Sequence, residues 1–234
     1  PEVSVLSFTD GKTVVPMVSS MDHKRALDGD RGLNTGGMGV IAPNPYYTPE
    51  VAARCMEEIF LPTLAAMRAE GCPFRGCLYF GLMITKDGPK VIEYNCRFGD
   101  PETQAVLPLM ESDLFAAMRA TTEGTLSQAD VRFRDGASCC VVLASGGYPE
   151  KYETGKPISG IPEAEKSAYV YHAGTKALED GTLVTSGGRV LGVTAVADDL
   201  PAAIRLAYEA ADHIRFDGLH RREDIGARAL KALG

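Results

Sequence analysis

The residues best suited to chemistry lie between Val91 and Glu102, in the stretch Val-Ile-Glu-Tyr-Asn-Cys-Arg-Phe-Gly-Asp-Pro-Glu. Its first residues favour a half-buried β-strand, and the Gly and Pro that follow predict a loop. Because side chains alternate between the two faces of a strand, Glu93, Asn95 and Arg97 are expected to point the same way. A carboxylate, an amide carbonyl and a guanidinium then form one polar row.

The polar row has the composition of a metal and phosphate site. Mg²⁺ takes one or two carboxylates and fills its other positions with substrate phosphates and water. Arginine offers a planar fork that matches phosphate oxygens. The alternative is a solvated strand face on which Glu93 and Arg97 form an ordinary pair, and these dozen residues alone leave both interpretations open.

A second polar stretch, residues 21–39, has little apolar periodicity and is rich in Asp, Lys, Arg, Asn and Gly. A loop of this length inside a domain is usually functional or disordered. The basic run at 23–25 brings positive charge, and the glycines within 36–39 let the backbone turn its N–H groups onto an anion. A flexible linker is the alternative, although linkers are seldom so basic. No Gly-Lys-Ser/Thr follows the glycines, so the stretch is not a P-loop.

Three other polar positions have a plain structural interpretation. Asp100 could contact metal or substrate, but its position also predicts the N-cap of a helix, with Glu102 favouring the positive end of the helix dipole. His172 lies among apolar and aromatic residues, where a hydrogen-bonded core histidine is expected. The glycines of Ser145–Gly147 are expected to serve turn geometry more than anion binding.

The elements that must position the polar row are a hairpin, a helix and a second hairpin. Strands are expected at 3–8 and 13–17 around an Asp10-Gly11 turn, and at 77–85 and 90–95 around an Asp87-Gly88 turn. A helix capped by Thr48 should run to about Glu70, with a kink at Pro62. Two further helices are expected at 101–110 and 112–123, the second with Ser112 as N-cap and with an apolar stripe of Leu114, Phe115 and Met118.

The second half of the sequence predicts a small α/β domain. Its expected strands are 137–144, 169–173, 183–185 and 190–196, followed by helices at 201–214 and 223–233. The predicted domains are therefore 1–133 and 134–234. The fold class is α/β (α+β), with an antiparallel sheet and helices in the first domain.

Composition excludes some classes of protein. The chain has 234 residues, 45% of them hydrophobic, and a net charge of -7 from 24 basic and 31 acidic side chains. This balance argues against nucleic acid or a membrane surface as a partner, because both attract a basic face. No apolar run reaches the roughly 20 residues that span a bilayer, so we expect a cytoplasmic protein. The six cysteines lack paired spacing and are expected to be reduced.

Six segments together resemble one enzyme family. They are Asp22-His-Lys-Arg25, Asn34-Thr-Gly-Gly-Met-Gly39, Val91 to Glu102, Gly146-Gly-Tyr-Pro149, His172-Ala-Gly-Thr175 and Ser186-Gly-Gly-Arg-Val190. In this order they resemble the glycinamide ribonucleotide synthetases (phosphoribosylamine–glycine ligases), ATP-grasp ligases of purine biosynthesis. The resemblance extends over almost the whole chain.

The resemblance implies a reaction and a set of site residues. It implies ATP and Mg²⁺ or Mn²⁺ as cofactors and glycine and 5-phosphoribosylamine as substrates, joined through a glycyl phosphate. Glu93 and Asn95 would bind the metal, and Arg97 would be the catalytic residue that stabilises the transferring phosphoryl group and binds the nucleotide with them. The substrate-binding residues would be Asp22, His23, Lys24, Arg25, Asn34, Thr35, Gly36, Gly37 and Asp100.

The resemblance also implies that part of the enzyme is not in this sequence. The chain opens on Pro1-Glu2 and enters a strand at once, whereas the family has an N-terminal domain and a lid before this point. We therefore expect a piece of a longer enzyme that is inactive alone and whose partner is the N-terminal part. Two alternatives stay open: another ATP-grasp carboxylate–amine ligase, and a non-catalytic ATP-grasp remnant.

Overall fold

The computed structural model describes residues 1–234, and the chain forms two compact units. Unit 1 comprises Pro1–Met21 and Pro43–Asp135, and unit 2 comprises Asp22–Ala42 and Gly136–Gly234. The segment 22–42, which the sequence-based division placed in the first domain, therefore folds with the second unit. Both units combine helices with antiparallel sheets, so the predicted α/β (α+β) fold class is confirmed.

Unit 1 is built on a four-stranded antiparallel sheet in the order β2-β1-β7-β8. Its strands are β1 (Glu2–Thr9), β2 (Val14–Pro16), β7 (Gly76–Thr85) and β8 (Gly88–Asn95). Both predicted hairpins are present, β1 with β2 and β7 with β8. The second turn lies at residues 86–87, one residue earlier than predicted, and Gly88 opens β8 with φ 108°.

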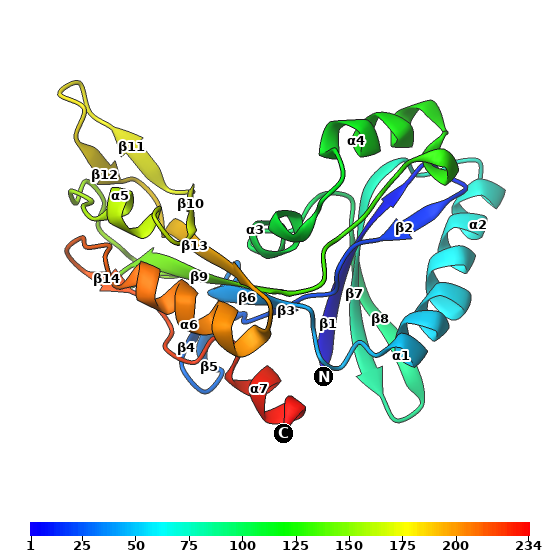
Figure 1. Cartoon of the computed structure of the whole chain (residues 1–234), viewed down its shortest axis with the longest axis horizontal. Helices are drawn as coiled ribbons and strands as arrows, with labels where there is room; N and C mark the ends of the chain where they lie inside the picture. Colours follow the sequence, from blue (N-terminus) through cyan, green and yellow to red (C-terminus); the bar gives the residue numbers. More distant parts are fainter. The chain divides into compact units, whose positions relative to one another are not determined.

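One face of this sheet is covered by a long interrupted helix (Figure 1). It consists of α1 (Pro49–Cys55), the π-helical turn η1 (Met56–Phe60) and α2 (Leu61–Ala69). Thr48 caps it as predicted, accepting a hydrogen bond from the Val51 N–H. The irregularity predicted at Pro62 takes the form of the π-turn just before it, because proline supplies no N–H for the helix ladder. Cys55, Phe60, Leu64 and Phe80 are in the core between helix and sheet.

The rest of unit 1 is a series of short helices. They are α3 (Glu102–Val106), η2 (Leu107–Leu109), α4 (Leu114–Glu123) and η3 (Leu126–Gln128). Two predictions for α4 are wrong. Its N-cap is Asp113, which accepts from the Ala116 N–H, and Ser112 lies outside the helix. The buried face carries Ala117 and Ala120, whereas Phe115 and Met118 are 73% and 39% exposed.

Unit 2 contains a six-stranded sheet with the path β10-β13-β9-β6-β3, and β14 pairs with β9. The strands are β3 (Met21–Asp22), β6 (Gly39–Ala42), β9 (Ala137–Ser145), β10 (Tyr169–His172), β13 (Arg189–Ala197) and β14 (Leu219–His220). Helix α6 (Leu200–Ala211) packs on β9 and β13 (Figure 1). The predicted strands and this helix are confirmed within a few residues at their ends.

Smaller elements complete unit 2. They are β4 (Arg25–Leu27) paired with β5 (Arg31–Asn34), β11 (Thr175–Ala177) paired with β12 (Leu183–Thr185), α5 (Ile161–Ala164) and α7 (Ala227–Leu233). The β4–β5 hairpin lies inside the stretch predicted to be a loop. Helix α7 starts four residues later than predicted, after Gly226 at φ 82°.

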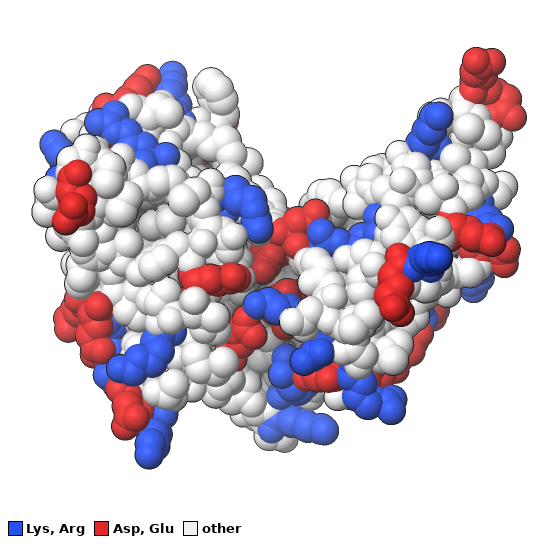
Figure 2. Space-filling model, turned by 180° about the vertical axis from the view of Figure 1, so that it is seen from behind, with Lys and Arg blue, Asp and Glu red and all other residues white.

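The surface mixes both signs of charge. On the face displayed in Figure 2, acidic and basic side chains are interspersed over both units and gather into no extended basic field. None of the helices has the length and apolar character that crossing a bilayer requires.

Candidate functional site

The predicted polar row is present on β8 and just beyond its end. The Asn95 side-chain amide donates to Glu93 Oε1 at 3.4 Å, and Arg97 Nη2 donates to Asn95 Oδ1 at 3.3 Å. Arg97 Nη1 also donates to the Phe98 carbonyl at 2.9 Å. Glu93 and Arg97 are exposed and Asn95 is half-buried. The three side chains therefore lie on one face, in contact with one another and open to solvent.

A bulge in β8 places the row on this face. Gly81 of β7 pairs with Glu93 and Leu82 pairs with Val91, so Ile92 is an extra residue between the two pairs. Because of this extra residue, Val91 shares a face with Tyr94, and the opposite face is left to the polar row. Gly81 has a direct role here, since a Cβ at this position would lie 2.9 Å from Glu93 Cγ. The glycine leaves the space that the Glu93 side chain occupies.

The donor set of the row suits a hard cation that also binds a phosphate. No group of three or more His, Cys, Asp or Glu side chains that could hold a metal occurs in the chain. One carboxylate and one amide oxygen from Glu93 and Asn95 fit the Mg²⁺ pattern, in which phosphates and water complete the coordination. Arg97 lies one step further along the same row, where its guanidinium could bind phosphate oxygens.

The residues after the row have structural partners. Asp100 Oδ1 accepts from the Gln104 side chain at 2.9 Å, and the N-cap of α3 is Pro101 with no side-chain bond, so the predicted Asp100 cap is wrong. Glu102 is 5% exposed and accepts from the Tyr79 hydroxyl at 3.0 Å. Asp100 is the exposed member of this pair of carboxylates.

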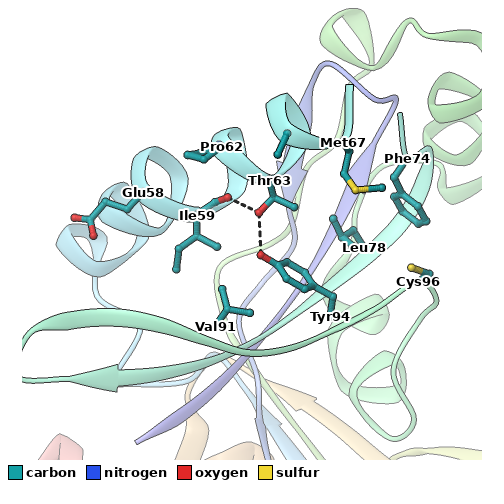
Figure 3. Close-up of a pocket in the computed structure, with 11 residues that line it drawn as sticks. Glu58, Ile59, Pro62, Thr63, Met67, Phe74, Leu78, Val91, Tyr94 and Cys96 are labelled. Atoms are coloured by element: carbon teal, nitrogen blue, oxygen red, sulfur yellow. Dashed lines mark hydrogen bonds between the residues drawn. The ribbon is translucent and has the colours of Figure 1, made fainter. Parts of the chain in front are cut away.

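A pocket lies on the other face of β8. It has a volume of about 510 Å³ between α2 and β8 and is lined by apolar groups, among them Val91 and Tyr94 (Figure 3). The Tyr94 and Thr63 hydroxyls lie 3.0 Å apart, and Thr63 donates to the Ile59 carbonyl. Val91 and Tyr94 point away from the side of the strand that carries Glu93. The pocket is therefore separate from the polar row, and its lining has no Lys or Arg side chain to bind phosphate.

In unit 2 the predicted glycine loop is closed by its own contacts. The Gly36 N–H donates to the Tyr148 hydroxyl at 3.0 Å, and the Gly37 N–H donates to Thr35 Oγ1 at 2.9 Å. Thr35 in turn donates its hydroxyl to the Lys24 carbonyl at 2.8 Å. The amides of Gly36 and Gly37, predicted to turn onto an anion, already have partners. The loop is a shaped turn and not an open anion nest.

His23 has a structural position. Its side chain is 1% exposed, with Nδ1 3.1 Å from the Gly39 carbonyl and Nε2 accepting from the Gly226 N–H at 3.1 Å. Burial lowers the pKa of His23, and the guanidinium groups of Arg222 and Arg228 lower it further, to about 4. The ring is therefore neutral at pH 7. The prediction that His23 brings positive charge is wrong, whereas its contact with substrate stays a prediction.

The other predicted loop residues differ in exposure. Asp22 and Lys24 are half-buried, whereas Arg25 and Asn34 are exposed at paired positions of β4 and β5. Arg25 Nη1 donates to the Gly32 carbonyl at 2.8 Å, so its guanidinium is partly used within the hairpin. The Asn34 side-chain amide makes no hydrogen bond within the chain and faces solvent. These loop residues belong to unit 2, whereas the polar row and Asp100 belong to unit 1.

The β4–β5 hairpin is held by a buried arginine that the sequence did not reveal. Arg222 is 1% exposed and binds both oxygens of Asp224 at 2.7 and 2.8 Å. Its Nη1 also donates to Asp30 at 3.0 Å and to the Arg25 carbonyl at 3.2 Å. Burial raises the pKa of Asp224, but hydrogen bonds from Arg222 and the Gly29 N–H outweigh it and hold that pKa well below its usual range. This network fixes the acidic turn between β4 and β5.

His172 also differs from its prediction. It is exposed, and its Nδ1 lies 3.0 Å from Thr175 Oγ1, so it is not a core histidine. The glycines of Ser145–Gly147 do serve geometry, since a Cβ at Gly147 would lie 2.1 Å from the Lys151 carbonyl. Gly147 has φ 94°, which glycine adopts without strain.

Comparison with known proteins identifies the two halves of the chain. Residues 1–103 match the family described as phosphoribosylglycinamide synthetase, ATP-grasp (A) domain, and residues 138–228 match its C domain. A curated phosphoribosylamine–glycine ligase from Chlorobaculum tepidum is 52% identical over 98% of this chain and 54% of that protein. The trifunctional purine biosynthetic protein adenosine-3 of Gallus gallus is 50% identical over 99% of this chain and 23% of its own length.

Solved structures agree with these matches. The crystal structure of a phosphoribosylamine–glycine ligase from Thermotoga maritima gives a TM-score of 0.86 at 38% identity, over 96% of this chain and 55% of that one. A biotin carboxylase from Campylobacter jejuni gives a TM-score of 0.63 at 13% identity over 94% of this chain and 46% of its own, a likeness of fold alone. The chain spans about half the length of the phosphoribosylamine–glycine ligases that it matches. The chain belongs to the phosphoribosylglycinamide synthetase family and carries its ATP-grasp (A) and C domains.

Proposed function

We propose that this chain is part of an ATP-dependent ligase that joins glycine to 5-phosphoribosylamine in purine biosynthesis. The products would be glycinamide ribonucleotide, ADP and phosphate, formed through a glycyl phosphate. Support comes from relatives about 50% identical over nearly the whole chain whose names state this ligase activity. The ligase would act in the cytoplasm on small molecules.

The observation that carries the proposal is the polar row on β8. Glu93, Asn95 and Arg97 lie in hydrogen-bonding sequence on one exposed face, with a carboxylate at one end and a guanidinium at the other. A bound Mg²⁺ or Mn²⁺ would neutralise charge on the nucleotide phosphates, and Glu93 and Asn95 are the residues that would hold it. Gly81 keeps the space beside Glu93 open.

Each residue of the row would then have a distinct task. Phosphoryl transfer needs positioning and charge stabilisation more than a protein nucleophile. Arg97 would act as the catalytic residue by placing its fork against the oxygens of the transferring phosphoryl group. Asn95, which accepts from Arg97, would keep that guanidinium aligned with the metal ligands.

The loop residues of unit 2 would bind the substrates. Asn34 and Arg25 are exposed and bring an amide and a guanidinium, groups that recognise carboxylate and phosphate. Asp22, Lys24 and Thr35 are partly accessible next to them. Gly36 and Gly37 would contribute the shape of the turn, because their N–H groups have other partners. Asp100, which is exposed in unit 1, would contribute a carboxylate for substrate in that unit.

The test is release of phosphate from ATP that depends on both glycine and 5-phosphoribosylamine. It is run on this chain alone and on a completed enzyme, in which the chain is joined to the part of the Chlorobaculum tepidum relative that it does not match. We expect activity in the completed enzyme and none in the chain alone, because nucleotide positioning accounts for much of the rate acceleration. The reaction omitting glycine, and one with alanine in its place, are the controls.

Two results would contradict the proposal. A completed enzyme that releases phosphate equally well without glycine is an ATPase and not this ligase. A completed enzyme that prefers another carboxylate substrate over glycine is a different carboxylate–amine ligase.

A further inference from the structure

Two of the sequence segments that mark the family have no task in the site described above. They are Gly-Gly-Tyr-Pro, which contains Tyr148, and Ser-Gly-Gly-Arg-Val, which contains Arg189. In unit 2 both side chains reach the same turn of the glycine loop. Tyr148 accepts from the Gly36 N–H at 3.0 Å, and Arg189 Nη1 donates to the carbonyls of Gly36 and Gly37 at 2.7 and 3.4 Å. Residues more than a hundred positions away thus hold both the backbone N–H and the carbonyl of Gly36.

The contact is close enough to need glycine at two places. A Cβ at Gly36 would lie 2.8 Å from Arg189 Cζ, so the guanidinium sits against the bare backbone. A Cβ at Gly188 would lie 2.2 Å from the Tyr148 ring, so the ring is seated against a second glycine. Gly36 of the loop and Gly188 of the Ser-Gly-Gly-Arg-Val segment therefore clear the space in which Arg189 and Tyr148 meet the loop.

These contacts fix the turn and leave one side chain free. With the Gly36 and Gly37 amides occupied and their carbonyls bonded to Arg189, the turn has few alternative conformations. Asn34, at the start of the same turn, is exposed and has no hydrogen-bond partner in the chain for its amide. The direction of that amide depends on the backbone that Tyr148 and Arg189 hold.

We propose that Tyr148 and Arg189 are positioning residues that hold the Asn34–Gly37 turn in the shape that binds an anionic substrate. They act through the loop backbone and need no contact with the substrate of their own. The inference rests on the proposed ligase function and adds to it a role for two residues of the C domain. Loss of either contact should weaken binding of an acid substrate while leaving the ATP site unchanged.

The first test measures the contact itself. Amide hydrogen exchange of Gly36 is compared in this chain, in Tyr148→Phe and in Tyr152→Phe. Tyr148→Phe removes only the hydroxyl that accepts from Gly36, and Tyr152 is a matched neighbour whose ring lies 6.2 Å from the Tyr148 ring. We expect exchange at Gly36 to be at least about tenfold faster in Tyr148→Phe, with no change in Tyr152→Phe. Equal exchange in all three would overturn the inference.

The second test measures the consequence in the completed enzyme. Tyr148→Phe and Arg189→Met should raise KM for glycine or for 5-phosphoribosylamine about fivefold or more, with KM for ATP within about twofold. Arg189→Lys should restore part of the loss, because one donor can still reach the Gly36 carbonyl. A merely structural defect would lower the amount of active enzyme and move kcat without splitting the KM values.

The outcomes separate this inference from the function on which it rests. A parent enzyme active with glycine whose variants keep all KM values would overturn the positioning role alone. A parent enzyme with no glycine-dependent phosphate release would overturn the ligase function, and the role in that reaction with it.

Discussion

The polar row on β8 and the loop that carries His23 both have the polar sequence expected of a ligand site, yet their side chains have opposite environments in the structure. Glu93 and Arg97 are exposed and are joined through Asn95 by long hydrogen bonds of 3.4 and 3.3 Å. His23 is 1% exposed, and both ring nitrogens lie 3.1 Å from backbone partners. The row has capacity left for a ligand, whereas His23 has none.

The difference shows how to separate binding residues from scaffold residues of the same chemical type. A buried polar group that is fully hydrogen-bonded stabilises the fold and resists change. An exposed group in a loose network can exchange its partners for a metal or a phosphate at little cost. On this criterion the buried Arg222 is a scaffold residue like His23, whereas the exposed Arg97 is a binding residue. Substitutions should therefore affect stability in one region and catalysis in the other.

The largest effect is expected at Arg222. Arg222→Leu leaves the partly buried carboxylate of Asp224 without its main partner, and leaves Asp30 with Arg228 as its remaining ion-pair partner. We expect a loss of about 3 kcal/mol in the free energy of unfolding, measured by urea denaturation at pH 7.5. Arg205→Leu, which removes an exposed pair with Glu209 on α6, should cost less than about 1 kcal/mol. Equal losses of unfolding free energy in Arg222→Leu and Arg205→Leu would show that the buried ion pairs of Arg222 stabilise the fold no more than an exposed pair does.

The next effect is a pH dependence due to His23. The folded pKa of His23 is about 4 and the unfolded value is 6.5, so the unfolded state binds the proton more tightly. Above pH 6.5 neither state binds this proton, and the free energy of unfolding is not reduced by His23. As the pH drops from 6.5 toward 4, the unfolded state takes up the proton first and the free energy of unfolding falls. We expect this group to account for about 2 kcal/mol of lost stability between pH 7.5 and pH 4.5.

The measurement for His23 is urea unfolding at both pH values for the parent chain and for His23→Gln. The variant cannot be protonated, so its loss of stability on acidification should be smaller than that of the parent by about the same 2 kcal/mol. Parallel losses in the two proteins would show that His23 does not titrate as its burial implies.

The sequence predicted the row and its strand because both depend on local patterns. The alternation of Glu93, Asn95 and Arg97 and the hairpin that carries them follow from the two-residue period of a strand and from a short turn. The bulge at Ile92 was not predicted, because a single extra residue leaves no clear mark in an apolar run. Glu93, Asn95 and Arg97 still share one face because the extra residue, Ile92, precedes Glu93.

The loop of unit 2 was predicted less well because long-range contacts decide its structure. His23 meets Gly226, and Arg222 meets Asp30, across about two hundred residues. The local sequence around a basic residue in a polar stretch is the same whether its side chain is exposed to solvent or forms a buried ion pair. The prediction of the apolar stripe on α4 was wrong for a similar reason. Contacts with the rest of unit 1 bury the face that carries Ala117 and Ala120, and Phe115 is left exposed.

In the polar row, Arg97→Lys should change catalysis and not stability. Lysine keeps the positive charge but loses the planar fork, so in the completed enzyme kcat should fall at least about tenfold with KM for ATP nearly unchanged. The free energy of unfolding should stay within about 0.5 kcal/mol, as for other surface substitutions. Arg119→Lys on the exposed face of α4 is the matched control. If kcat of Arg97→Lys stays within about threefold of the parent, the phosphoryl-stabilising role is wrong.

A smaller and more specific effect is expected from Gly81→Ala. The added Cβ would lie 2.9 Å from Glu93 Cγ, which forces the Glu93 side chain to move without changing its charge. We expect metal affinity to fall about threefold or more. In Glu93→Gln the same change at Gly81 should have little further effect, since the two residues act at one place. If the losses of metal affinity from Gly81→Ala and Glu93→Gln add up in the double variant, Gly81 does not act through the Glu93 side chain.

The most direct test of the comparison is Mg²⁺ binding by the row. Isothermal titration of the completed enzyme with Mg²⁺ in the presence of an ATP analogue is carried out for the parent, Glu93→Gln and Glu58→Gln. Glu58 is an exposed glutamate of unit 1 outside the row, and circular dichroism checks the fold of each variant. We predict that Glu93→Gln binds Mg²⁺ at least about tenfold more weakly, while Glu58→Gln matches the parent. Equal affinity in all three folded proteins would contradict the assignment of the row as the metal site.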